Sequence, residues 1–175
     1  MDNKIKKINP ANKHFSAGFI TNNFKETQKL GELLALEIES ERKGDGALIL
    51  CLEGDLGAGK TTFTQGLLKG LKVKGPYTSP TFVVMKEYEI KDTNYKKQIT
   101  NKLQTNYKIQ KVYHIDAYRV NANDVLNLGW EEIISDPKNI IIVEWAERIK
   151  KILPKDAIKI KFEWLDEKQR KVIFT

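Results

Sequence analysis

One stretch of the chain combines glycines, a lysine and a hydroxyl residue at a spacing that suits phosphate chemistry. Residues 54–61, Gly-Asp-Leu-Gly-Ala-Gly-Lys-Thr, fit the phosphate-loop pattern G-x-x-x-x-G-K-[ST] at every required position. The glycines allow backbone angles that turn successive N–H groups inward toward a polyphosphate. Lys60 supplies a mobile positive charge for the β and γ phosphates, and the Thr61 hydroxyl is a hard oxygen ligand for Mg²⁺. The sequence therefore predicts a nucleotide site with contacts from Asp55, Leu56, Gly57, Ala58, Gly59, Lys60, Thr61 and Thr62.

The residues around this stretch supply the strand and the helix that such a loop needs. Ala47–Leu52 is an uninterrupted apolar run, too short for a helix, which is typical of a parallel strand covered on both faces. After the loop, Phe63, Leu67 and Leu71 recur at helical spacing. The order strand, glycine loop, helix brings a helix N-terminus, with its partial positive charge, to the phosphates.

Two acidic residues stand where short apolar strands end. Residues 112–116 and 140–144 are each predicted to form a strand, and these strands close with Asp116 and Glu144. In an open α/β sheet, ligands bind beyond the carboxyl ends of the strands, where the glycine loop must also lie. We therefore expect Asp116 and Glu144 to lie beside Thr61 as Mg²⁺ ligands and catalytic groups. The alternative for either residue is a solvated carboxylate that caps the next turn.

Three further positions near these strand ends are open to two interpretations each. Trp145 follows Glu144, so its ring could stack on a nucleotide or belong to the core. His114 shares a strand face with Asp116, but a lone histidine in a strand is more often a hydrogen-bonded packing residue. Ser79-Pro80-Thr81 is a stiff segment whose two hydroxyls could sense a γ-phosphate or form only a turn.

What the sequence lacks narrows the choice of nucleotide and reaction. The guanine-specificity string N-K-x-D is missing, because all three Asn-Lys pairs are followed by the wrong residue two positions on, and this favours ATP over GTP. Small-molecule kinases usually surround the transferred phosphoryl group with several arginines, and the whole chain has four. Hydrolysis of ATP is therefore favoured, and a kinase acting on a small metabolite or a protein is the alternative.

Strands alternate with helices along the chain, which predicts one α/β domain over residues 1–175. We expect a mixed, mostly parallel sheet flanked by helices, with an antiparallel hairpin. The remaining expected segments are a polar lead-in (1–14), a short strand (15–21), an amphipathic helix (24–43) begun by Asn22, Asn23 and Glu26, an antiparallel strand pair (81–90 and 112–118) around a polar insertion (91–110), a helix capped by Asn123 that ends at Asp136, and a closing hairpin (158–164 with 172–174).

Composition excludes several classes of protein. The chain is 41% hydrophobic and 30% charged, as in an ordinary globular domain, and its longest apolar run is far shorter than the roughly 20 residues of a membrane span. The N-terminal residues lack the apolar segment of a secretory signal, and the single cysteine, Cys51, lies within an apolar run that suggests a buried, inert thiol. We expect a cytoplasmic protein without a membrane partner.

The net charge of +7 is concentrated in one segment. Residues 91–111 hold six lysines and one aspartate, which leaves +2 for the rest of the chain. Dedicated nucleic-acid readers usually rely on arginine, so a solvated lysine surface is favoured over a binding patch, and no DNA partner is expected.

Five segments together resemble the TsaE (YjeE) family of bacterial ATPases: GDLGAGKTT (54–62), SPTF (79–82), HIDAYR (114–119), LGWEE (128–132) and VEWAE (143–147). The resemblance runs from about Phe24 to the C-terminal hairpin. It implies a small phosphate-loop ATPase with a mixed sheet that works in threonylcarbamoyladenosine modification of tRNA. It also implies action on tRNA only indirectly, with a threonylcarbamoyl-transferase subunit (TsaD) and its inactive homologue (TsaB), whose complex ATP turnover resets between cycles.

The resemblance assigns roles to individual positions. Lys60 and Thr61 match the phosphate-loop lysine and the magnesium threonine, and Asp116 matches an aspartate needed for ATP hydrolysis. Glu144 and Trp145 match a glutamate at the metal and a tryptophan over the nucleotide. Thr81 falls in the switch-like S-P-T segment, and by a looser analogy Arg170 lies near the nucleotide. The 91–110 stretch is longer and more basic than the usual connection, which leaves a third alternative: a nucleotide-gated binding module whose basic tip touches tRNA.

Overall fold

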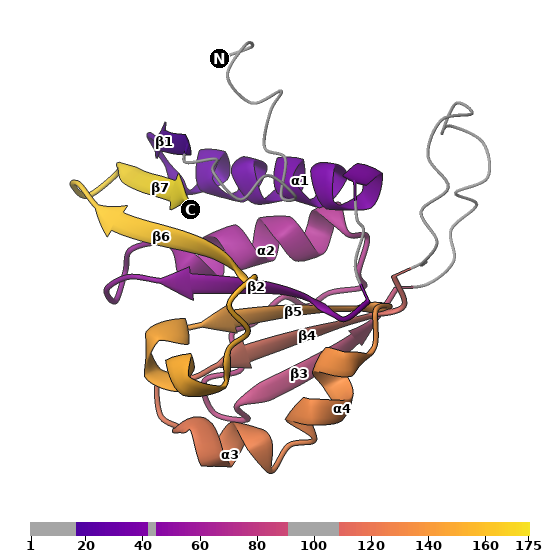
Figure 1. The fold of residues 1–175 in the computed structure, drawn as a ribbon. Coiled ribbons are helices and arrows are strands. Elements are labelled where there is room, and N and C mark those ends of the chain that lie inside the picture. The colour runs from indigo at the N-terminus through magenta and orange to yellow at the C-terminus, as the bar shows by residue number, and fades with distance from the viewer. Residues whose placement is uncertain (1–16, 42–44, 91–108) are drawn as a thin grey trace.

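The computed structural model describes residues 17–41, 45–90 and 109–175, which form a seven-stranded sheet with helices on both faces (Figure 1). The strand order is β1-β7-β6-β2-β5-β4-β3. The strands are β1 (Ala17–Thr21), β2 (Leu48–Glu53), β3 (Met85–Glu89), β4 (Lys111–Asp116), β5 (Asn139–Glu144), β6 (Ile158–Trp164) and β7 (Arg170–Phe174).

Parallel strands form the centre of the sheet and antiparallel strands form its edges. β2 pairs in parallel with β5 and β6, and β5 pairs in parallel with β4. β3 runs antiparallel to β4, while β7 runs antiparallel to both β6 and β1. The expected mixed α/β sheet with an antiparallel closing hairpin is confirmed.

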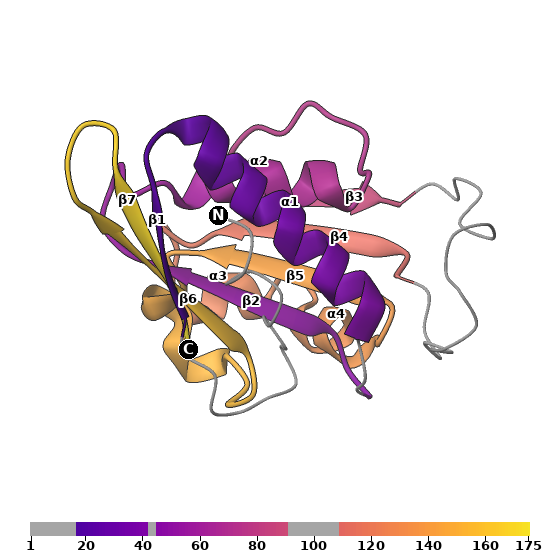
Figure 2. The same cartoon turned by 90° about the horizontal axis from the view of Figure 1, so that it is seen from above.

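The helices divide between the two faces, and each face has its own apolar core. Helices α1 (Phe24–Glu41) and α2 (Lys60–Gly70) cover one face, where Leu34, Phe63 and Phe162 are among the buried side chains (Figure 2). The other face packs against α3 (Ala122–Leu126), α4 (Trp130–Ser135) and the 3₁₀ helix η3 (Ala146–Ile152). β5 is buried along its whole length, because it receives cover from both layers.

Helix α1 begins where the sequence indicates. The Asn23 side chain accepts a hydrogen bond from the Glu26 amide, and the Glu26 carboxylate accepts one from the Asn22 amide in return. These reciprocal bonds satisfy backbone donors that a helix start leaves unpaired. Leu34 and Ile38 then bury completely on the face toward α2.

Glycines allow α1 and α2 to approach each other closely. A Cβ atom added at Gly66 of α2 would lie 1.9 Å from the backbone oxygen of Gln28 in α1. One added at Gly31 of α1 would lie 2.3 Å from the Phe63 oxygen of α2. The helix that starts at the glycine loop is therefore held against α1 by backbone-to-backbone contact that no larger residue permits.

Two expected elements differ from the structure. The strand expected over 81–90 begins only at Met85, because residues 79–84 form a turn held by side-chain hydrogen bonds. The single helix expected from Asn123 to Asp136 is two helices, since Gly129 adopts a left-handed φ of 82° between them. The cap is Asn121, whose side chain accepts from the amides of Asn123 and Asp124.

Parts of the sequence-based expectations lie outside the described residues. These are the lead-in 1–14, residues 15–16 of the expected first strand, residues 42–43 of the expected amphipathic helix and, apart from its last two residues, the insertion 91–110. Among the helices that the structure describes, none combines the length and the apolar character needed to cross a bilayer. Cys51 is buried in β2, and burial raises the pKa of its thiol to about 12.

We predict that Gly66→Ala destabilises the protein although alanine is the better helix former. The helix preference is worth about 0.5–1 kcal/mol in favour of alanine, whereas forcing a methyl group into a filled interface costs about 1–3 kcal/mol. The free energy of unfolding, measured in urea, should therefore fall. Gly18→Ala on the edge strand β1 is the matched control, since its nearest contact is the flexible Lys171 side chain at 3.9 Å. Equal stability of the Gly66 and Gly18 variants would contradict the close-packing argument.

Candidate functional site

The glycine loop connects the end of β2 to the start of α2 in a conformation that needs its glycines. Gly54, Gly57 and Gly59 all have positive φ angles, of 135°, 76° and 102°. A Cβ atom on Gly54 would lie 2.3 Å from the backbone oxygen of Phe162, so both angle and space select glycine there. The loop thus presents backbone N–H groups and the N-terminus of α2 at one place, an arrangement that suits an anion.

Lys60 places its charge inside this loop. Its side-chain Nζ donates to the backbone oxygens of Gly54 and Asp55, the latter at 2.9 Å. The same ammonium group lies 3.6 Å from the centre of the Trp145 ring, a cation–π contact. Burial lowers the pKa of Lys60, and the nearby carboxylates, chiefly Glu144, act in the opposite direction.

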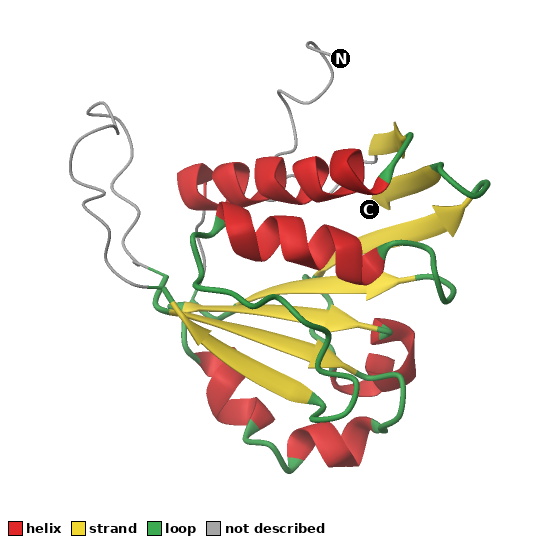
Figure 3. Ribbon diagram, turned by 180° about the vertical axis from the view of Figure 1, so that it is seen from behind, coloured by secondary structure: helices red, strands yellow, loops and turns green. Residues whose placement is uncertain are grey.

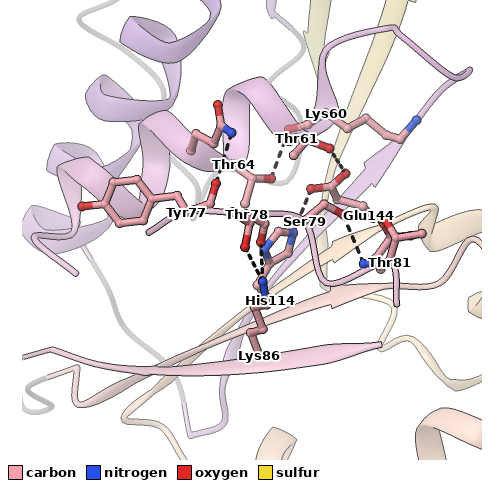
Figure 4. Close-up of polar contacts among 12 residues, drawn as sticks. Lys60, Thr61, Thr64, Tyr77, Thr78, Ser79, Thr81, Lys86, His114 and Glu144 are labelled. Atoms are coloured by element: carbon pink, nitrogen blue, oxygen red, sulfur yellow. Dashed lines mark hydrogen bonds and ion pairs between the residues drawn. The ribbon is translucent and has the colours of Figure 1, made fainter. Parts of the chain in front are cut away.

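Glu144 lies directly against the first turn of α2. Its Oε2 accepts a hydrogen bond of 2.6 Å from the Thr61 hydroxyl, and its Oε1 is 2.8 Å from Nε2 of His114 (Figure 4). Glu144 and His114 are each only 1% exposed. Both oxygens of a buried carboxylate therefore have hydrogen-bond partners, and the group lies next to the Thr61 hydroxyl, which the glycine-loop pattern predicts to be a metal ligand.

Asp116 occupies the neighbouring strand end but has different partners. In the β4–β5 ladder it stands opposite Glu144. Its Oδ2 accepts from the hydroxyls of Ser79 and Thr81, and its Oδ1 accepts from the Tyr118 amide at 3.0 Å. The structure thus brings Glu144 to Thr61, whereas Asp116 holds the Ser79–Thr81 segment.

The segment that Asp116 holds is strained and partly exposed. Val84 adopts a φ of 64°, which is unfavourable for a β-branched residue, and its oxygen accepts from the Asp116 amide at 2.9 Å. Phe82 is 85% exposed at the tip, where the Arg119 guanidinium lies over its ring. Strain of this kind persists only where the surrounding contacts enforce it.

Trp145 lies beside the ammonium group of Lys60 at the glycine loop. It follows Glu144 with a left-handed φ of 60°, and its half-buried ring contacts Lys60 on one side and Tyr118, at 4.9 Å between ring centres, on another. The ring also packs against the apolar core on the face of α3, α4 and η3, and its stacking on a nucleotide stays a prediction.

The glycine loop also contacts the start of β7, through Arg170. Arg170 donates from Nε to the Gly57 oxygen at 3.0 Å, and its NH1 is held by the backbone oxygens of Asp166 and Gln169. Figure 3 shows the loop between β2 and α2 at the same end of the molecule as the turn between β6 and β7. Of the other loop residues, Leu56 is 79% exposed and Ala58 is buried.

Sequence reasoning missed two contacts of this site. His114 is the buried, hydrogen-bonded residue that the sequence favours, but its partner Glu144 was not predicted, and Ser79 was not singled out as a partner of Asp116. A signal for His114 existed, because strand alternation places it on the face that also holds Asp116. Its partner Glu144 lies 30 residues further along the chain, and that contact depends on the pairing of β4 with β5.

Comparison with known proteins identifies the family. The family described as "Threonylcarbamoyl adenosine biosynthesis protein TsaE" matches residues 21–172. The chain belongs to the TsaE family. Among TsaE relatives, that of Bacillus subtilis (strain 168) is 34% identical over 155 residues, covering 89% of this chain and 82% of the relative. That of Aquifex aeolicus (strain VF5) is 40% identical over 149 residues, covering 84% of this chain and 86% of the relative.

A solved structure supports the same family. The crystal structure of YdiB from Bacillus subtilis superposes with a TM-score of 0.61 at 28% identity, covering 91% of this chain and 84% of that one. The two TsaE relatives above are named tRNA threonylcarbamoyladenosine biosynthesis proteins. Fold and family membership therefore agree with the resemblance that the five sequence segments indicate.

We predict that Asp116→Ala loosens the 79–84 segment. A hydrogen bond to a charged group contributes about 1.5–3 kcal/mol, so losing those from Ser79 and Thr81 should speed local opening by at least about tenfold. Hydrogen exchange of the Val83 and Met85 amides, both bonded within the turn, measures this. Asp156→Ala, at an exposed aspartate before β6, is the control and should leave these amides unchanged. Unchanged exchange in the Asp116 variant would show that the carboxylate does not hold the turn.

Proposed function

We propose that the chain is a Mg²⁺-dependent ATPase required for threonylcarbamoyladenosine modification of tRNA. It would act with a TsaD-type transferase and its TsaB-type homologue, and ATP turnover would reset that complex. Membership of the TsaE family supports the tRNA modification pathway. The observation that carries the ATPase proposal is the contact between Thr61 and Glu144 beside the buried ammonium of Lys60.

The loop supplies what a triphosphate needs. Lys60 brings a point charge enclosed by the loop, and the N-terminus of α2 adds partial positive charge at the same place. Thr62, in the first turn of α2, adds a hydroxyl to this helix start. Trp145, already over the ammonium group, lies where an aromatic ring would shield bound phosphates from water.

The residues present fit magnesium. Within the described residues, no three His, Cys, Asp or Glu side chains gather as a metal-binding group. Mg²⁺ is commonly held by one or two carboxylates together with substrate phosphates and water, and it favours hard oxygen ligands. Glu144 and the Thr61 hydroxyl provide such oxygens side by side. When bound, the ion neutralises charge that develops on the phosphates.

Asp116 is suited to orienting the water that attacks the γ-phosphate. Its Oδ2 already accepts two hydroxyl hydrogen bonds, whereas its Oδ1 accepts one, from the Tyr118 amide. A carboxylate oxygen has two lone pairs, so Oδ1 retains one for a water molecule. In this proposal Thr81 and Ser79 hold the carboxylate in the orientation that this role requires.

The loss of the Lys60 charge should weaken nucleotide binding. We expect Lys60→Met, which keeps most of the apolar stem beneath Trp145, to raise the dissociation constant for ADP by about 10- to 100-fold, since charge-assisted hydrogen bonds are worth about 1.5–3 kcal/mol. Isothermal titration calorimetry measures this change. Lys159→Ala, at an exposed lysine of β6, should bind ADP like the unaltered protein. Equal affinity of the Lys60 and Lys159 variants would remove Lys60 from the binding site.

The proposed activity and its partners can be tested together. Purified protein should release inorganic phosphate slowly from ATP, with association with the TsaD–TsaB pair depending on nucleotide. Asp116→Asn and Glu144→Gln should reduce turnover more than they reduce ADP binding, because Asp116 is proposed to orient the attacking water and Glu144 to hold the ion beside the γ-phosphate. Label from γ-labelled ATP on an acceptor other than water would instead favour the kinase. Absence of any nucleotide-dependent association would overturn the assignment to this complex.

A further inference from the structure

Among the described residues, the His114 side chain has one polar contact, and that contact is to the carboxylate proposed to hold magnesium. Its Nε2 lies 2.8 Å from Oε1 of Glu144 at a position that is almost fully buried. When Glu144 is ionised, both of its oxygens accept, and the hydrogen of this bond then belongs to Nε2. The Thr61 hydroxyl donates to the other oxygen of the same group. Glu144 is thus fixed by one donor on each oxygen.

The register of β4 and β5 places His114 beside Glu144. His114 pairs with Ile142 in the β4–β5 ladder, two residues before the position where Asp116 pairs with Glu144. The His114 donor therefore comes from the neighbouring strand β4, while the Thr61 donor comes from helix α2. With Oε1 held from the sheet, the carboxylate turns Oε2 toward α2 and the glycine loop (Figure 4).

A role in packing alone accounts poorly for this residue. Nδ1 of His114 is buried and has no hydrogen-bond partner among the described residues. A buried nitrogen without a partner costs about 1–3 kcal/mol, which an aliphatic residue at the same position would avoid. The hydrogen bond to Glu144 is the interaction that the imidazole makes and an aliphatic side chain could not.

We propose that His114 is a positioning residue that sets the affinity of the site for Mg²⁺ by orienting Glu144. The inference rests on the function proposed above. Partners of this kind orient the carboxylates that bind metals, and their replacement typically costs about 10- to 100-fold in metal affinity. His114 itself touches neither nucleotide nor metal in this proposal, so the affinity for nucleotide in the absence of Mg²⁺ should not depend on it.

The test separates these two affinities in one series of variants. His114→Leu removes the donor, and His114→Gln keeps an N–H donor at a similar reach. ADP binding is measured by calorimetry, first in EDTA and then at increasing Mg²⁺, and thermal melting reports folding. We expect His114→Leu to bind ADP normally in EDTA but to need at least about tenfold more Mg²⁺ for the half-maximal change in affinity. His114→Gln should recover most of the loss.

Two further variants make the result decisive. Asn139→Ala removes a buried hydrogen bond to the Ile133 oxygen at the opposite end of β5, so it should lower stability without changing the Mg²⁺ requirement. If His114→Leu fails to fold, His114→Asn replaces it, because its shorter side chain keeps a polar group but does not reach Glu144.

The possible outcomes point to different failures. An unchanged Mg²⁺ requirement in His114→Leu, or a loss of ADP affinity in EDTA equal to the loss with Mg²⁺, would overturn the positioning role. A Mg²⁺ requirement in His114→Gln as high as in His114→Leu would do the same. If the unaltered protein binds ADP with no response to Mg²⁺, it is the proposed magnesium-dependent function that fails.

Discussion

The burial of one ammonium group constrains the whole site. Lys60 is 4% exposed, and removing a charge from water is unfavourable unless hydrogen bonds and opposite charges replace the solvent. The oxygens of Gly54 and Asp55, the Trp145 ring and the carboxylate of Glu144 provide that replacement. The glycine loop is therefore part of one electrostatic arrangement with the end of β5 and the left-handed turn at Trp145 that follows it, although the loop lies far from both in the sequence.

Parallel pairing at the centre of the sheet makes this arrangement possible. β2, β4 and β5 run side by side in the same direction, so the glycine loop, Asp116 and Glu144 leave the sheet at one edge. The contact of α2 with α1 through Gly31 and Gly66 then fixes where the first turn of α2 stands. The Thr61 hydroxyl meets Glu144 because both the strand register and the helix position are determined by packing elsewhere.

How much of this could be predicted from the sequence depends on how local each feature is. The glycine loop, its flanking strand and helix, and the carboxylates at the ends of β4 and β5 are short patterns, and the structure has them where they were expected. The turn at 79–84 replaced part of an expected strand because Thr81 bonds to Asp116, 35 residues away. The contact between His114 and Glu144 likewise needs the register of two strands, which no local pattern specifies. The division of the 122–135 region was different, since a glycine inside a helical pattern is itself a signal for a helix end.

The two carboxylates illustrate how neighbouring groups of like charge acquire separate roles. Asp116 and Glu144 are direct neighbours across β4 and β5, and adjacent like charges repel. Each is turned to its own donors, Glu144 to His114 and Thr61, and Asp116 to the hydroxyls of the 79–81 segment. The Lys60 charge attracts both, more strongly Glu144 than Asp116. The donors of Glu144 come from β4 and α2, whereas most of those of Asp116 come from the 79–84 turn, in which Val84 adopts a positive φ of 64°. The first carboxylate is therefore fixed by regular elements, and the second is tied to a strained turn.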